Sequence, residues 1–274
     1  MGIEEVGPGA SRASGDAVEP GGPDGIEIRR LDGVPRREGG SPETVLVFLH
    51  EGLGSVSHWG SFPERLCDRT GAGGWIYSRP GYGWSRPRKP PWPVDLFRIE
   101  AEETLTAVVA AIDAPRVVLF GHSDGATIAL RYLAEQPDDR VAGAVLEAPH
   151  VFVEEYGLRS IRAADRGYVE SGLARALSRH HRDVDMAFGG FVSLWLSPEF
   201  RSWEFEGLDR VDRPVLVIQG SEDEYGTMEH PRRIAAGVSG PVEVVELPGC
   251  GHAPHREAPE EVLSLTEVFL AGLS

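Results

Sequence analysis

Short runs of consecutive apolar residues recur along the chain, and stretches with helical periodicity separate them. A strand that is apolar at every position must be covered on both faces, as in a parallel sheet between two layers of helices. The alternation therefore predicts an α/β fold with a mostly parallel, doubly wound sheet. We expect strands over residues 25–31, 45–50, 75–78, 116–120, 141–146, 214–219 and 242–247, and helices over 57–69, 95–112, 125–135, 229–238 and 259–273.

One stretch, residues 150–210, interrupts the alternation, because it has no strand pattern and is rich in aromatic residues. Short helices between two strands often cover a pocket, so we expect a helical cap here; extra core helices on the sheet are the alternative. Residues 25–149 and 211–274 would form the core. Residues 1–24 are rich in Gly and Pro and are expected to be a disordered tail. The aromatic residues are Phe152, Tyr156, Tyr168, Phe188, Phe191, Trp195, Phe200, Trp203 and Phe205.

Charge and composition narrow the class of partner. The chain has 27 Lys and Arg against 43 Asp and Glu, a formal net charge of −16. This charge repels nucleic-acid phosphates and anionic membrane surfaces, so neither is an expected partner. No apolar run reaches the roughly 18 residues of a spanning helix, and Cys67 and Cys250 are too few for a disulfide framework. The acidic start does not resemble a signal peptide, so we expect a cytoplasmic protein.

The most informative motif is Gly-His-Ser-Asp-Gly at residues 121–125, between a predicted buried strand and a predicted helix. This context is typical of a nucleophile elbow, in which a sharp turn projects a serine hydroxyl from the sheet edge. Gly121 and Gly125 keep Cβ atoms out of the space where strand and helix approach. The pattern therefore indicates Ser123 as a candidate nucleophile.

A serine hydroxyl needs a base, and the base needs an orienting carboxylate. In this topology both should follow later strands, in the order Ser, Asp, His. Asp223 follows the strand that ends near Gly220, and His252 follows the next strand. These positions predict that Ser123, Asp223 and His252 meet at one sheet edge. Alternative acids are Glu147, Glu222 and Glu224.

Together these motifs resemble those of the α/β-hydrolase superfamily of serine hydrolases, from about residue 25 to residue 274. The resemblance implies that Ser123 is the nucleophile, Asp223 the acid and His252 the base. It also implies an oxyanion hole made of the Asp124 amide and the amide of Gly52 or Leu53. The motifs that carry it lie at residues 49–54 (LHEGLG), 79–85 (RPGYGWS), 121–125 (GHSDG), 220–223 (GSED) and 251–252 (GH).

Several residues near this edge are candidates for substrate binding. Glu51, which replaces a usual glycine of the family, Asp124 and Glu147 could recognise a cation on the substrate, or could pair with Arg79 or another buried base. We also expect Trp195 of the aromatic stretch to contact substrate. The histidines lack a full ligand set at recognisable spacing, so no metal is expected. The chemistry implied needs no cofactor.

The function expected from these residues is hydrolysis of a small or medium carboxylic ester through an acyl-enzyme. The partner is then a small-molecule substrate. Alternatives on the same fold are a carbon–carbon bond hydrolase, a thioesterase or an acyltransferase, since fold alone does not choose a substrate. An alternative of another class is a non-catalytic ligand receptor, which need not retain Ser123, Asp223 and His252.

Overall fold

A computed structural model of the chain describes residues 19–34, 42–135 and 138–273. The described residues form one eight-stranded sheet in the order β1-β2-β4-β3-β5-β6-β7-β8. β1 and β2 are antiparallel to their neighbours, and the other strands are parallel. The strands are β1 (Glu19–Pro20), β2 (Glu27–Leu31), β3 (Thr44–Leu49), β4 (Gly73–Tyr77), β5 (Arg116–His122), β6 (Val141–Glu147), β7 (Val215–Gly220) and β8 (Val242–Leu247).

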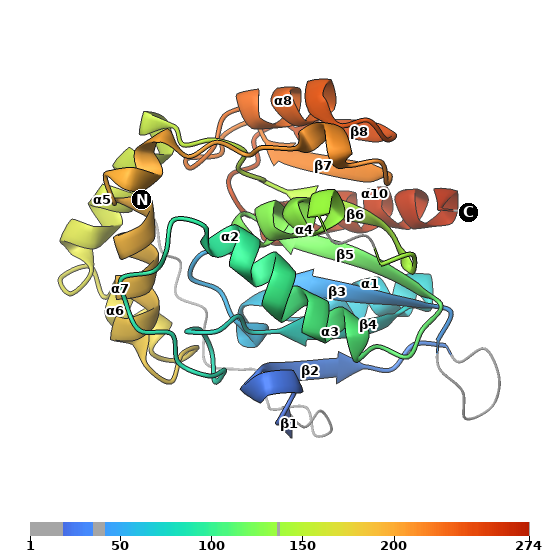
Figure 1. Ribbon diagram of the computed structural model, residues 1–274, viewed down its shortest axis with the longest axis horizontal. Helices are drawn as coiled ribbons and strands as arrows, with labels where there is room; N and C mark the ends of the chain where they lie inside the picture. Colours follow the sequence, from blue (N-terminus) through green and yellow to red (C-terminus); the bar gives the residue numbers. More distant parts are fainter. Residues whose placement is uncertain (1–18, 35–41, 136–137, 274) are drawn as a thin grey trace.

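Helices cover both faces of this sheet, which confirms the predicted α/β-hydrolase type of architecture (Figure 1). The longer helices are α1 (Phe62–Thr70), α4 (Asp124–Glu135), α5 (Glu155–Gly167), α7 (Val184–Trp195), α8 (Glu229–Gly237) and α10 (Pro259–Gly272). The shorter ones are η1 (Pro23–Gly25), η2 (Val56–Trp59), α2 (Leu96–Ile99), η3 (Glu100–Leu105), α3 (Thr106–Ala110), α6 (Leu173–Leu177), η4 (Glu199–Ser202), η5 (Leu208–Arg210) and α9 (Pro254–Glu257).

Alternate residues of each central strand enter two different hydrophobic cores. In β3, Val45 and Val47 face one core, which contains residues of α2, α3 and α4, whereas Leu46 and Phe48 face the other, which contains residues of α1 and α10. All four side chains are buried. The period of two along a strand thus explains why the runs are apolar throughout.

Three expected elements differ in detail. The helix expected over 57–69 is divided into η2 and α1. The helix expected over 95–112 is continuous through α2, η3 and α3, but η3 is a π-helical segment, which the imperfect apolar stripe did not predict. Of the tail expected over 1–24, residues 1–18 lie outside the described residues. Its last residues are ordered instead, because β1 pairs with β2.

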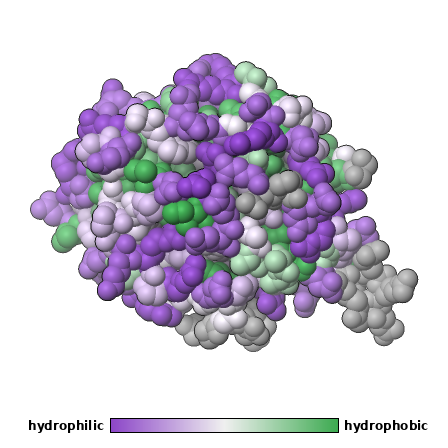
Figure 2. Space-filling view, viewed as in Figure 1, coloured by the Kyte–Doolittle hydropathy of each residue, from purple (hydrophilic) through white to green (hydrophobic). Residues whose placement is uncertain are grey.

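Residues 150–210 leave the sheet after β6 and return to it at β7. Figure 1 shows α5, α6 and α7 beyond the ends of the parallel strands, on the left of the view. One isolated bridge, between Phe152 and Glu204, joins the two ends of this stretch. The face seen in Figure 2 is mostly hydrophilic, and its apolar residues form separate areas.

Candidate active site

The turn between β5 and α4 has the geometry of a nucleophile elbow. Ser123 has a φ of 54°, in the left-handed region that side chains other than glycine rarely adopt. Its amide donates to the Glu147 carbonyl at 2.8 Å, which ties the turn to β6. A Cβ on Gly125 would lie 2.1 Å from the Leu49 carbonyl oxygen, and one on Gly121 only 2.5 Å from the Gly125 carbonyl oxygen. The two glycines therefore allow the close approach that the turn requires.

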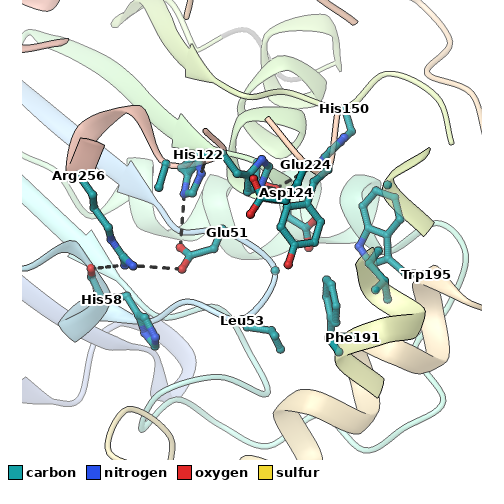
Figure 3. A pocket seen from close by; sticks show the side chains of 18 of the residues that line it. Glu51, Leu53, His58, His122, Asp124, His150, Phe191, Trp195, Glu224 and Arg256 are labelled. Atoms are coloured by element: carbon teal, nitrogen blue, oxygen red, sulfur yellow. Dashed lines mark hydrogen bonds and ion pairs between the residues drawn. The ribbon is translucent and has the colours of Figure 1, made fainter. Parts of the chain in front are cut away.

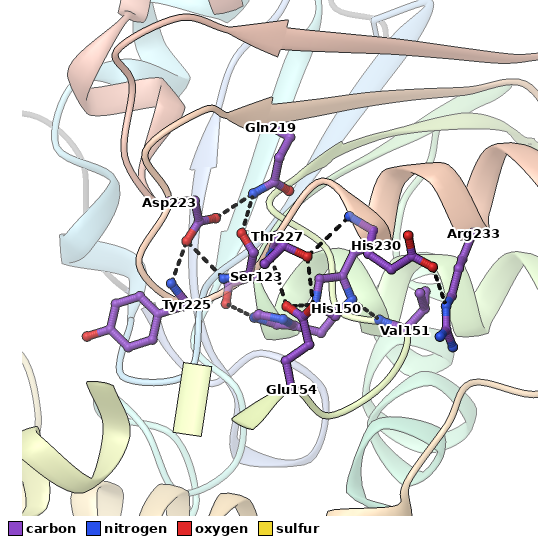
Figure 4. A network of polar contacts seen from close by, with 12 residues as sticks. Ser123, His150, Val151, Glu154, Gln219, Asp223, Tyr225, Thr227, His230 and Arg233 are labelled. Atoms are coloured by element: carbon purple, nitrogen blue, oxygen red, sulfur yellow. Dashed lines mark hydrogen bonds and ion pairs between the residues drawn. The ribbon is translucent and has the colours of Figure 1, made fainter. Parts of the chain in front are cut away.

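Ser123, His252 and Asp223 form a chain of hydrogen-bond contacts, as the sequence predicted for their positions. Figure 4 shows Ser123 and Asp223 of this chain. Ser123 Oγ is 3.0 Å from His252 Nε2, and His252 Nδ1 is 2.9 Å from both oxygens of Asp223. The Gln219 side chain and the Tyr225 amide also donate to Asp223. A serine that faces an imidazole oriented by a carboxylate can be activated for attack on a carbonyl carbon.

Asp223 is held in its charged form. Burial alone would raise the pKa of this carboxyl group, but the hydrogen bond from His252 and the charge of that ring outweigh burial. The pKa of Asp223 falls to about 2. An ionised Asp223 fixes the proton of His252 on Nδ1, so Nε2 is free to accept the proton of Ser123.

The loop after β3 is fixed from both sides. His50 Nδ1 and the Arg79 guanidinium both donate to the Glu51 carbonyl, at 2.7 and 2.8 Å. Burial lowers the pKa of His50, so its ring is neutral, and its Nε2 accepts from the Arg79 amide. His181, between α6 and α7, contacts the Leu53 carbonyl at 2.9 Å. Gly52 and Leu53 are therefore held beside the amino end of α4, as an oxyanion loop requires.

A cavity of about 370 Å³ opens onto Ser123 and His252. Figure 3 shows Asp124, His150 and Trp195 among the residues that line it. The sheet edge forms one wall, and residues of α5, α6 and α7 form the other. The apolar and aromatic lining residues are Leu53, Phe152, Ile161, Ala164, Leu173, Leu177, Phe191, Trp195, Tyr225 and Ala253. The ionisable ones, apart from Ser123 and His252, are Glu51, His58, His122, Asp124, His150, Glu154, Glu224, Tyr225, Arg256 and Glu257.

Two of the expected substrate-binding acids line this cavity, and both have basic neighbours. Asp124 lies 3.4 Å from the buried Arg79 guanidinium, although burial still raises the pKa of Asp124 above its ordinary value. Glu51 lies 3.6 Å from His122 and 3.9 Å from Arg256. Burial opposes the charge on Glu51, but these neighbours lower its pKa well below the ordinary value. Pairing with these basic neighbours therefore explains why Asp124 and Glu51 lie at the cavity, without a cation on the substrate.

Glu147 is the expected substrate-binding residue that the structure does not bring to the cavity. Its side chain is fully buried and lies 2.7 Å from His255 Nδ1. It is thus bonded to a different histidine from the one that faces Ser123. Trp195, in contrast, lines the cavity.

His150 is a site residue that the sequence reasoning missed. Its Nε2 lies 3.2 Å from Ser123 Oγ, on the far side of the serine from Asp223 (Figure 4). His150 lies three residues after β6, which is paired with β5. The signal was therefore present, since any polar residue just after a strand next to the elbow strand is a candidate.

Within residues 19–34, 42–135 and 138–273, no three or more His, Cys, Asp or Glu side chains are grouped so that they could hold a metal ion. In the same part of the chain, no helix is both long and apolar enough to cross a membrane.

Comparison with known proteins identifies the family. The sequence model of the alpha/beta hydrolase family matches residues 46–265. Protein PHYLLO, chloroplastic, from Arabidopsis thaliana is 25% identical over an alignment 285 positions long that covers 83% of this chain. The chain spans only 15% of that protein's length.

Solved structures of two esterases have the same fold. The esterase EaEST from Exiguobacterium antarcticum has a TM-score of 0.70 at 17% identity, covering 92% of this chain and 98% of that one. The esterase RhEst1 from Rhodococcus sp. ECU1013 has a TM-score of 0.63 at 24% identity, covering 94% and 98%. From its sheet, its elbow and the match over residues 46–265, this chain belongs to the alpha/beta hydrolase family.

Proposed function

We propose that this hydrolase cleaves carboxylic esters through an acyl-enzyme formed on Ser123. The observation that carries the proposal is the pair of distances at His252: 3.0 Å from Nε2 to Ser123 Oγ and 2.9 Å from Nδ1 to Asp223. His252 takes the serine proton as Oγ attacks the ester carbonyl, and then gives it to the departing alcohol. Water, activated by the same imidazole, releases the acid.

The developing oxyanion is stabilised by backbone amides in this proposal. Asp124 is the first residue of α4, so its amide has no acceptor within the helix. The second amide is that of Gly52 or Leu53, because the Gly54 amide already donates to the Glu51 carbonyl. The positive end of α4 adds to the stabilisation.

The cavity favours an ester without negative charge. Of the five carboxylates in its described lining, Asp124 is paired with Arg79 and Glu51 with Arg256, which leaves an excess of negative charge at Glu154, Glu224 and Glu257. Such a lining repels a carboxylate or phosphate on the substrate, since charges in a partly buried site are weakly screened. The apolar side chains from α5, α6 and α7 suit an apolar acyl group of small or medium length.

The charge of the cavity lining also distinguishes ester hydrolysis from the alternative functions on the same fold. Thioesters of phosphate-bearing carriers and carboxylate-bearing carbon–carbon substrates are disfavoured by the same excess of acidic side chains. A non-catalytic receptor would not need a serine, histidine and aspartate in hydrogen-bond contact. Labelling of the wild type, but not of Ser123→Ala, by a fluorophosphonate probe would count against that alternative.

The proposal is tested with p-nitrophenyl esters and intact-protein mass spectrometry. We expect turnover of p-nitrophenyl butyrate, a mass increase of one acyl group on the wild type, and neither with Ser123→Ala. Loss of a triad nucleophile typically costs about a millionfold in kcat. A p-nitrophenyl hemisuccinate of similar size should have a much lower kcat/KM than its methyl ester. Full activity of folded Ser123→Ala would refute the proposal.

A further inference from the structure

Two imidazoles, not one, contact the oxygen of Ser123. His252 Nε2 lies 3.0 Å from Oγ and His150 Nε2 lies 3.2 Å from it. The serine has one hydroxyl proton, so it can donate to only one of them. His252 Nδ1 donates to Asp223, which leaves His252 Nε2 as the acceptor of the serine proton. His150 Nε2 must then carry a hydrogen and donate it to Oγ.

The surroundings keep His150 neutral and in place. Burial, followed by the nearby His230 and His252 rings, lowers the pKa of His150 well below its ordinary value. Thr127 Oγ1 bonds both the carbonyl and the amide of His150, at 2.8 and 3.1 Å. The Trp195 ring packs edge-on at 5.1 Å. His150 is therefore a fixed donor without net charge.

The same surroundings make His150 a poor second base. In the described structure, Asp223 is bonded to His252 and Glu154 to His230, and no carboxylate is bonded to the His150 ring. Without such a partner, a buried imidazolium is not stabilised. His150 can thus donate a hydrogen bond to Oγ but is not suited to take its proton.

We propose that His150 is a further catalytic residue, whose Nε2–H stabilises Ser123 Oγ as the acyl-enzyme breaks down. This inference rests on the proposed ester hydrolysis. In that step water adds to the acyl carbon and gives its proton to His252. The bond from carbon to Oγ then breaks, its electron pair stays on Oγ, and His252 returns the proton to Oγ. His150 keeps its own proton throughout.

The hydrogen bond from His150 to Ser123 Oγ should affect the rate of deacylation more than the rate of acylation. In the free enzyme the serine hydroxyl already accepts the hydrogen bond from His150, so part of its effect is present before attack. In the acyl-enzyme Oγ is an ester oxygen, which is a weak acceptor, and it becomes a strong one only as charge develops. Removing the donor should therefore slow deacylation selectively.

The test compares four variants by stopped flow with p-nitrophenyl butyrate, measuring acylation and deacylation rates separately. His150→Leu removes the donor and should slow deacylation by about 10- to 100-fold, with a smaller effect on acylation. The acylated fraction of the enzyme in the steady state, detected by intact mass, should then be larger than in the wild type. His150→Gln can place an amide N–H near Nε2 and should restore most of the rate, whereas the shorter His150→Asn should not.

His230→Gln is the matched control, because His230 packs 5.2 Å from His150, ring to ring, and is not bonded to Ser123. It should leave the ratio of the two rates unchanged. If His150→Leu does not fold, the Gln and Asn variants still decide the question. An unchanged ratio in folded His150→Leu, or equal ratios in the Gln and Asn variants, would overturn the inference. Full turnover of the ester by folded Ser123→Ala would instead refute the proposed function.

Discussion

The backbone of Ser123 is strained by its left-handed conformation, with a φ of 54°. A Cβ costs about 1–2 kcal/mol in this region, and glycine avoids that cost at the expense of some unfolded-state entropy. We therefore expect Ser123→Gly to be more stable to urea than Ser123→Ala, by about 0.5–1 kcal/mol. Both variants lack the hydroxyl, so the difference isolates the backbone. Equal unfolding free energies would mean that the turn relaxes in the alanine variant.

We expect substitutions of the two buried carboxylates Asp223 and Glu147 to have different effects on kcat. Asp223→Asn should lower kcat by roughly ten-thousandfold, because His252 loses the partner that orients its ring. Glu147→Gln should leave kcat near the wild-type value, since Glu147 bonds His255 rather than His252. Steady-state assays of both variants with one ester make the comparison. The reverse pattern would place the orienting acid on β6.

At the residue scale, the sequence predicted where the site residues lie better than it predicted which side chains they contact. Ser123, Asp223 and His252 could be placed together because each follows the carboxyl end of a parallel strand. The pairing of Asp124 with Arg79, or of Glu147 with His255, joins residues 45 and 108 positions apart. No local pattern encodes such contacts, and they decide whether a carboxylate is available to a substrate.

At the scale of elements, helix α7 depends on a glycine at its contact with the loop before α2. A Cβ on Gly190 would lie 2.0 Å from the Trp92 ring, whereas one on Gly189 would have its nearest neighbour at 3.8 Å. Gly190→Ala should therefore destabilise the protein by about 1–3 kcal/mol. Gly189→Ala should stabilise it by up to about 1 kcal/mol through helix propensity.

Thermal unfolding and KM together check this pair. Displacement of α7 moves Phe191, which lines the cavity, so Gly190→Ala should also raise KM for the ester. Gly189→Ala should leave KM unchanged. Similar melting temperatures for the two variants would show that α7 is not pressed against Trp92 in solution.

The order and type of elements were predictable because the central strands are buried on both faces and read as continuous apolar runs. The π-helical segment η3 has no signal in the apolar periodicity. The division of η2 from α1 has a local signal that the periodicity does not contain, since Gly60 ends η2 with a φ of 58° and Pro63 lies in the first turn of α1. The short strand β1 exists only through its pairing with β2.

For the whole molecule, buried and half-buried neutral histidines should make stability fall on mild acidification. Burial is the largest cause of a lowered pKa at six of them, and for His58 the value falls to about 3. The unfolded chain takes up protons near pH 6.5 where the folded chain does not, so the unfolding free energy decreases below that pH. The limit is about 1.4 kcal/mol per pH unit for each histidine. The six are His50, His58, His150, His180, His181 and His255.

Urea unfolding at pH 7.5, 6.5 and 5.5 measures this slope, and His58→Gln should reduce it. The net charge of −16 at pH 7 has the opposite tendency, since acidification relieves self-repulsion. His122, whose pKa the neighbouring Glu51 raises despite burial, also opposes the trend. The slope of the wild type therefore contains these opposing contributions, and an unchanged slope in His58→Gln would contradict the histidine explanation.

The helical stretch between β6 and β7 begins and ends on paired neighbouring strands. Its first residue, Ala148, still bonds Ile218 of β7 at 2.9 Å, and the bridge from Phe152 to Glu204 closes its base. Ser123, Asp223, His252 and His150 all lie outside residues 153–203. A foreign helical segment grafted between these two positions would leave the reactive groups where they are if it keeps the contacts of His181 with the Leu53 carbonyl and of Trp195 with His150. Directed evolution of substrate range can accordingly be confined to one exchangeable cassette of the gene.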